Sequence, residues 1–181
     1  MSPRAQFEAA VMYRSPEGVP IGLAFAFMSA LYFRGKITYA LHFGGAENTR
    51  VIAPGYGLVE PTWSINEKRM NKMRKTDVDM RDRTYVKTLR ATALELASTL
   101  DADAQVVLLG SVATGKYVDI LLPIFGDRLR FPSAFAGLGD MSRGGLMLRA
   151  VRANRELEYT TLDAPRHRGP GGTGKIPAHL L

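Results

Sequence analysis

Residues Gly110 to Lys116, with the sequence GSVATGK, carry the spacing GxxxxGK. In a P-loop this spacing places backbone amides and a lysine around phosphate groups at the start of a helix. The next position needs Ser or Thr to bind magnesium, but Tyr117 occupies it, and no later apolar strand ends in an aspartate. The turn therefore predicts a phosphate or another anion held without a metal by amides and Lys116. The candidate ligand-binding residues are Gly110, Ser111, Lys116 and Tyr117.

A second glycine-rich turn, GLGDMSRGG, begins at Gly137 and leads into a predicted helix. Glycines here allow close approach of the backbone to a ligand, and Asp140 is expected to be the N-cap of the helix. Arg143 falls in the first helical turn, where its charge opposes the helix dipole. An anion beside Arg143 would explain this placement, and a solvent-facing arginine is the alternative. The candidate residues are Gly139, Asp140, Ser142 and Arg143.

A third turn lies within TRVIAPGYGLVEP, from Thr49 to Pro61, and places Tyr56 between two glycines after a short apolar run. The glycines would let the backbone approach a planar ligand on which Tyr56 could stack. The alternative is that Tyr56 packs beneath the turn. The candidate residues are Gly55, Tyr56, Gly57 and Glu60. For hydrolysis the plausible polar groups are Glu60, Asp140 and Ser142, but none has a paired base in the sequence, so no catalytic residue is identified.

The elements that must position these turns alternate between apolar runs and helical patterns. Strands are predicted at residues 22–29, 49–54, 105–110 and 128–131, with an edge strand at 156–162. Helices are predicted at 30–43, from Asp82 onward, at 115–126 and after 139, whereas 60–80 is polar and irregular. This alternation predicts an α/β fold, a three-layer sandwich around a mainly parallel sheet of about four strands. Ligands bind at the carboxyl ends of such strands, so the three turns are expected to converge on one site.

The charge of the chain is concentrated in one segment. The 181 residues carry a formal net charge of +7, and residues 66–90 hold nine Lys or Arg against four Asp or Glu. This surplus fits a phosphate-rich partner, although a solvated basic face would show the same pattern. The candidate nucleic-acid-binding residues are Lys68, Arg69, Lys72, Arg74 and Lys75.

Composition also narrows the classes of protein and site. The chain has no cysteine and only three histidines, without metal-ligand spacing, so no metal site and no cofactor is predicted. The apolar stretch 19–33 is too short to span a bilayer and no signal peptide is recognised, so no membrane partner and a cytoplasmic location are expected. We expect a flexible leader at 1–18, one α/β domain at 19–163 and a disordered basic tail at 164–181.

The order of the motifs resembles the YaaA-like proteins, which are related to the uracil-DNA-glycosylase-like α/β superfamily. The resemblance runs over about residues 22–150. It rests on the Tyr-Gly-Leu turn at Tyr56 followed by Pro61, on a helix bearing Tyr117, and on the GLG turn at Gly137. The chain has Met28-Ser29 where this group often has a cysteine, and it lacks a helix-hairpin-helix sequence. The resemblance implies a nucleic-acid or nucleobase ligand.

These observations together favour a nucleic-acid-associated domain that binds a nucleobase or nucleotide at the strand ends, with base processing or modification as a possible activity. Two alternatives stay open: a non-catalytic DNA- or RNA-binding module, and a metal-independent nucleotide-binding protein. The expected partner is nucleic acid, with DNA favoured over RNA, or a free nucleotide.

Overall fold

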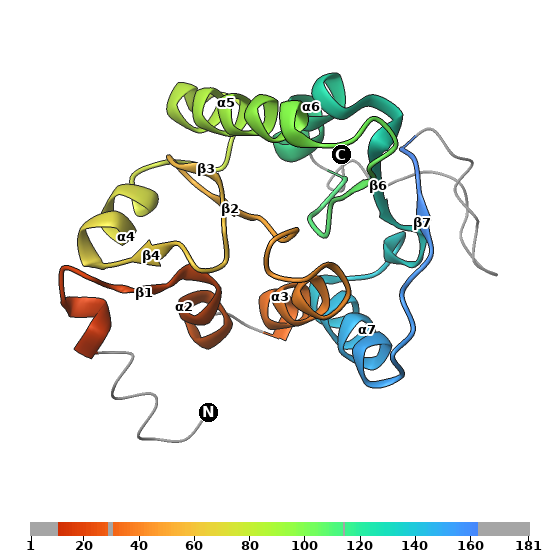
Figure 1. Ribbon diagram of the computed structural model, residues 1–181, viewed down its shortest axis with the longest axis horizontal. Helices are drawn as coiled ribbons and strands as arrows, with labels where there is room; N and C mark the ends of the chain where they lie inside the picture. The colour runs from red at the N-terminus through yellow and green to blue at the C-terminus, as the bar shows by residue number, and fades with distance from the viewer. Residues whose placement is uncertain (1–10, 29–30, 114, 163–181) are drawn as a thin grey trace.

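The computed structural model describes residues 11–28, 31–113 and 115–162. Helices dominate this part of the chain, and the strands are short (Figure 1). The α-helices are α2 (Ile21–Met28), α3 (Leu31–Gly44), α4 (Glu67–Arg74), α5 (Arg83–Thr99), α6 (Gly115–Phe125) and α7 (Asp140–Arg152). The strands are β1 (Val19–Pro20), β2 (Val51–Ala53), β3 (Gly57–Val59), β4 (Ser64–Ile65), β5 (Val106–Val107), β6 (Leu129–Pro132) and β7 (Tyr159–Thr160). Two 3-10 turns, η1 (Gly126–Arg128) and η2 (Ser133–Phe135), flank β6.

The strands form three small sheets, so the prediction of one mainly parallel sheet of about four strands within a three-layer sandwich is wrong. β1 pairs with β4 and β2 pairs with β3, and both pairs are antiparallel. The third sheet has the order β5-β6-β7, and only its β5–β6 pair is parallel. Helices α5 and α6 lie on one side of the strands, and α2, α3 and α7 lie on the other (Figure 1).

The apolar run at 105–110 pairs over only two residues, although it predicts a full central strand. The reason is that its side chains serve two separate cores. Leu108 is buried in the cluster formed with α5 and α6, whereas Leu109 packs against the cluster formed by α3 and α7. An apolar run therefore reports correctly that both faces are covered, but it does not report how many backbone groups are paired.

Residues 22–29, predicted as a buried strand, form helix α2 instead. A continuous apolar run has no period that separates a strand from a helix. The first amides of α2 find acceptors in the following loop: Ile21 N–H donates to Trp63 O at 2.8 Å and Gly22 N–H to Pro61 O at 2.9 Å. These bonds satisfy donors that a helix start leaves unpaired, and they anchor α2 beside β4.

The amphipathic pattern after Asp82 is confirmed as α5. Asp82 is its N-cap, and the carboxylate accepts the amides of Thr84 at 2.8 Å and Tyr85 at 3.0 Å. Tyr85 and Leu89 are buried along one face. The preceding segment, predicted to be irregular over 60–80, contains the short helix α4, whose N-cap Asn66 accepts the amide of Arg69 at 3.1 Å.

Helices α3 and α7 pack against each other through two glycines. A Cβ atom placed on Gly35 would lie 2.8 Å from the carbonyl oxygen of Gly144, and one placed on Gly144 would lie 2.8 Å from the Cα atom of Tyr32. Separations below 3.0 Å essentially never occur for real Cβ atoms. The backbones therefore approach more closely than any other residue pair would allow, and the two helices lie side by side (Figure 1).

The chain ends are described only in part. Of the predicted leader 1–18, residues 11–18 are described, and they are linked to the β4–α4 region. The Asn66 side chain donates to Pro16 O at 3.0 Å, and the Ser64 hydroxyl donates to Glu17 O. The predicted tail, residues 164–181, lies outside the described residues. Among the residues that the structure describes, no helix has the length and apolar character needed to cross a membrane.

Candidate anion-binding site

Helix α3 contributes a tyrosine and a lysine one turn apart, Tyr32 and Lys36. The Nζ atom of Lys36 lies 3.8 Å from the centre of the Tyr32 ring. The Tyr32 hydroxyl donates to the carbonyl oxygen of Leu109 at 3.2 Å, immediately after β5. This bond joins α3 to the chain that leads into α6. The spacing of four residues places both side chains on one face of the helix.

Helix α7 contributes Arg143, whose side chain is largely buried. Only 12% of this side chain is exposed, and its nearest carboxylate is that of Asp140, with Nη1 3.7 Å from Oδ1. The guanidinium carbon lies 5.6 Å from the centre of the Phe135 ring. The Nε atom is buried and has no hydrogen-bond partner among the described residues. Because buried polar atoms are normally paired, this N–H is a donor available to a ligand.

Helix α6 contributes Lys116 and Tyr117 in its first turn, and both side chains are half-buried. The Nζ atom of Lys116 lies 5.2 Å from the centre of the Tyr117 ring. Buried Tyr85, from α5, donates its hydroxyl to the carbonyl oxygen of Lys116 at 2.8 Å, which holds the start of α6 in place. A Cβ atom on Gly110 would lie 3.2 Å from the Tyr117 ring, so the ring rests against this glycine.

These side chains define what we call the α3/α6/α7 site: Tyr32, Lys36, Lys116, Tyr117, Asp140 and Arg143. Its electrostatics show most clearly at Lys36. Burial lowers the pKa of this amine to about 8, from an ordinary value of 10.5. The carboxylate of Asp140 acts in the opposite direction, and the positive charges of Lys116 and Arg143 lower the pKa further. The site therefore holds more positive charge than its one carboxylate balances.

The two phenols of the site are neutral hydrogen-bonding groups. Burial raises the pKa of Tyr32, and the nearby Arg143 partly offsets this effect. Burial also raises the pKa of Tyr117, with smaller contributions in the same direction from Tyr32 and Asp140. Both hydroxyls consequently keep their protons at neutral pH.

The carboxyl ends of the parallel strands β5 and β6 lead into two of the predicted turns, at residues 110–117 and 137–143. The structure brings Lys116, Tyr117, Asp140 and Arg143 together around α3. Helix α7 begins at Asp140 with Gly139 as its N-cap, so the expectation that Asp140 would be the N-cap is wrong. The sequence reasoning did not nominate Tyr32 and Lys36. Their spacing of four on a predicted helix was the available signal.

The remaining residues of these two turns have local roles or no described partner. The Ser111 hydroxyl accepts the amide of Ala113 at 3.3 Å, a bond within the turn. Gly139 and Ser142 are exposed. The carboxylate of Asp119 lies where a side chain on Gly115 would be, and so a carboxylate of the protein itself occupies the space beside the first residue of α6. The side-chain cations, rather than an open cradle of amides, are therefore the anion-binding feature of the site.

The turn around Tyr56 belongs to a different part of the molecule. The Tyr56 ring packs on Trp63, with centroids 4.8 Å apart, and the Nζ atom of Lys72 lies 4.2 Å from its centre. A Cβ atom on Gly55 would lie 2.8 Å from the Thr76 hydroxyl, and one on Gly57 would meet α5. Tyr56 thus packs beneath its turn against α4, and the expected convergence of all three turns is not observed. Glu60 is exposed and accepts the Thr62 hydroxyl at 3.4 Å.

The basic residues of the segment 66–75 divide into two groups. Lys68, Lys72, Arg74 and Lys75 are exposed on α4 and its C-cap. Arg69 is half-buried: its guanidinium donates to the carbonyl oxygen of Ser64 and lies 4.7 Å from the centre of the Trp63 ring. Arg69 therefore has a structural role, whereas the other four form an exposed surface that we call the α4 basic face.

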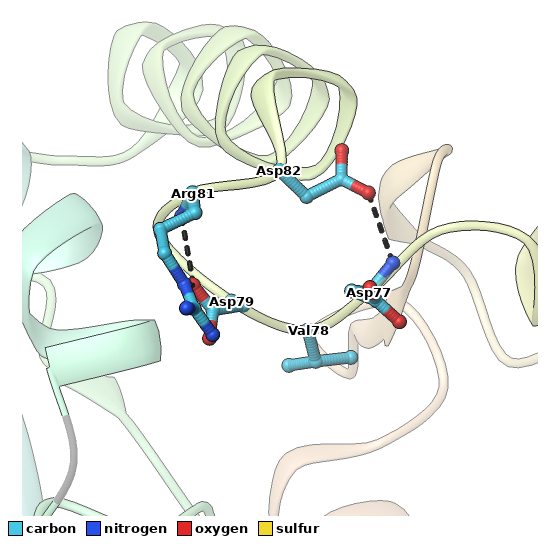
Figure 2. A pocket seen from close by; sticks show the side chains of 5 residues that line it. All are labelled: Asp77, Val78, Asp79, Arg81 and Asp82. Atoms are coloured by element: carbon cyan, nitrogen blue, oxygen red, sulfur yellow. Dashed lines mark hydrogen bonds and ion pairs between the residues drawn. The ribbon is translucent and has the colours of Figure 1, made fainter.

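A shallow hollow between α4 and α5 is lined by Asp77, Val78, Asp79, Arg81 and Asp82 (Figure 2). Its charged groups already have partners. Arg81 pairs with Asp79 at 2.9 Å, a contact that lowers the pKa of Asp79 to about 2. Asp82 accepts the amide of Asp77 at 2.9 Å in addition to capping α5. Within the described ranges, no three His, Asp or Glu side chains gather in a way that could hold a metal ion.

In comparisons with protein-family models, with curated proteins and with solved structures, nothing matches this chain.

Proposed function

We propose that the protein binds a phosphorylated ligand, a nucleotide or a nucleic-acid phosphate, at the α3/α6/α7 site without a metal. The observation that carries this proposal is the gathering of Lys36, Lys116 and Arg143, from three helices, around the single carboxylate of Asp140. Bringing three cations together is unfavourable unless an anion offsets their repulsion. The buried Nε–H of Arg143, unpaired within the described chain, is a donor suited to a phosphate oxygen.

The phosphate part of this proposal rests on the cations, and the nucleotide part rests on the resemblance to the YaaA-like proteins. The tyrosines do not provide an open stacking surface, because Lys36 lies over the Tyr32 ring and the Tyr117 ring rests against Gly110. We therefore expect recognition mainly through the phosphate groups, with the two phenols as additional hydrogen-bond donors.

Replacing Lys116 with alanine, or Arg143 with glutamine, is expected to weaken nucleotide binding about ten- to a hundredfold, because each change removes a charge-assisted hydrogen bond. Isothermal titration calorimetry with AMP, ATP and inorganic phosphate measures this loss. The control is Lys87→Ala, which removes an exposed lysine of α5. EDTA should not change the affinity. Equal affinity of the wild type and both variants, or a metal requirement, would contradict the proposal.

A second candidate function is nucleic-acid binding by the α4 basic face, and its exposed cations favour it. The helix carries only one acidic residue, Glu67, in its first turn. A polyanion that releases counterions on binding is the natural partner of such a surface.

Reversing Lys68, Arg74 and Lys75 to glutamate is expected to remove most of the affinity for duplex DNA at low salt and to flatten its salt dependence by about 0.9 log units per lost phosphate contact. Arg69 is left unchanged because of its bond to Ser64. The matched control reverses Arg83, Lys87 and Arg90, three exposed cations of α5, with the same change in net charge. Fluorescence anisotropy with a labelled duplex measures both. Equal loss in the two triple variants would show that only net charge matters.

A further inference from the structure

Lys36 differs from the other cations of the α3/α6/α7 site in its surroundings. Its amine is half-buried on α3, lies over the Tyr32 ring at 3.8 Å, and faces charged or phenolic groups from every helix of the site. These groups are Tyr32 from α3, Lys116 and Tyr117 from α6, and Asp140 and Arg143 from α7.

We propose that Lys36 is a reactive amine that forms an imine with an aldehyde or ketone carrying a phosphate, and that Lys116 and Arg143 hold this phosphate. The inference rests on the proposed function, since the same two cations bind the phosphate. Their two positive charges balance a phosphate dianion, so Lys36 does not have to be protonated for the ligand to bind.

The chemistry requires a neutral amine. An ordinary lysine is almost entirely protonated at neutral pH, whereas an amine whose pKa is about 8 is neutral in a substantial fraction of molecules. Burial and neighbouring cations are the usual means by which a protein makes a lysine nucleophilic. At Lys36 both are present, and the carboxylate of Asp140 opposes them only in part.

The step is balanced within the site. The Nζ lone pair of Lys36 attacks the carbonyl carbon, and the new N–C bond gives a carbinolamine after a proton moves from nitrogen to oxygen. The hydroxyl then leaves as water, taking one further proton, while nitrogen loses its last proton and the C=N bond forms. Tyr32 and Tyr117 keep their protons at neutral pH, and so a phenol can deliver the proton to the leaving hydroxyl and recover it from nitrogen.

Pyridoxal 5′-phosphate is a suitable probe because it combines an aldehyde with a phosphate. The full chain is incubated with the probe, the imine is reduced with sodium borohydride, and the modified lysine is located by peptide mass spectrometry. Lys36 is expected to react about tenfold or more faster than exposed Lys87 in the same sample. The rate at Lys36 should reach half its maximum near pH 8, the pKa of this amine.

Three variants test the assignment. Lys36→Arg keeps the positive charge and should abolish the selective label. Lys116→Ala and Arg143→Gln should slow labelling of Lys36 by pyridoxal 5′-phosphate about tenfold, for the loss of one charge-assisted phosphate contact, and leave labelling by phosphate-free pyridoxal unchanged. Excess inorganic phosphate should compete only against the phosphorylated probe. A label spread evenly over the lysines would overturn the proposal.

The outcomes also separate this inference from the proposed function. If nucleotides bind the wild type while Lys36 reacts no faster than Lys87, the imine inference is wrong and the proposed function stands. If Lys36 labels selectively but neither inorganic phosphate nor the Lys116 and Arg143 variants affect it, the phosphate part is wrong, and the proposed function fails with it.

Discussion

Replacing Gly144 with alanine should lower the free energy of unfolding by about 3 kcal/mol, the cost of overpacking a tight contact. A Cβ atom at this position would lie 2.8 Å from the Cα atom of Tyr32 and 2.9 Å from the carbonyl oxygen of Leu31. Both are backbone atoms of α3, so α3 and α7 have to move apart as rigid elements. Urea denaturation followed by circular dichroism measures the loss.

The adjacent residue of the same helix supplies the control. A Cβ atom on Gly145 would meet only the end of the flexible Arg149 side chain, at 3.4 Å. Gly145→Ala should therefore leave stability unchanged or raise it by up to about 1 kcal/mol, from the better helix propensity of alanine. Equal effects of the two variants would contradict the close contact of α3 and α7.

The Gly144 variant also tests how the candidate site is held together. Tyr32 and Lys36 lie on α3, and Asp140 and Arg143 lie on α7. If the glycine contact sets the distance between these pairs, the fraction of Gly144→Ala that remains folded should bind phosphate more weakly than Gly145→Ala does. Unchanged affinity in the folded protein would show that the site does not depend on this contact.

Replacing Gly57 with alanine is expected to cost about 3 kcal/mol as well, the sum of left-handed backbone strain and overpacking. Gly57 has φ of 84°, and a Cβ atom there would lie 2.5 Å from the carbonyl oxygen of Thr88 and against the Thr92 hydroxyl. The Thr92 hydroxyl also accepts the amide of Leu58 at 2.8 Å. The substitution would therefore push β3 away from α5. Thermal and urea denaturation measure the effect.

Gly137 separates the two causes of this loss. Its φ of 74° is similar, but no heavy atom lies within 4 Å of a Cβ atom placed there. Gly137→Ala should therefore cost only the backbone strain, about 1–2 kcal/mol. If both variants lose the same amount, the close approach of the hairpin to α5 does not matter. The predicted difference assigns Gly57 to packing against a helix rather than to a ligand.

Local patterns were sufficient where one element could be identified from its own residues. The spacing of Tyr85, Leu89 and Ala93 predicts α5, and Asp82 predicts its start. The pattern at 30–43 predicts α3, and the turns before α6 and α7 were recognised from their glycines. Periodicity and capping act over a few residues, so a single sequence carries this information. The apolar run that became α2 has no such period, and there the prediction is wrong.

The sequence by itself determined which helices form, where basic charge is concentrated, and that Lys116 and Arg143 begin two helices beside glycine-rich turns. Only the tertiary structure decided that the strands divide into three small sheets, that Tyr56 packs on Trp63, and that Lys36 joins the other two cations. Strand pairing and the meeting of α3, α6 and α7 depend on contacts between residues far apart in the chain. The close approach at Gly35 and Gly144, 109 residues apart in the numbering, has no local signature, because a glycine in a helix looks the same whether or not another backbone rests against it.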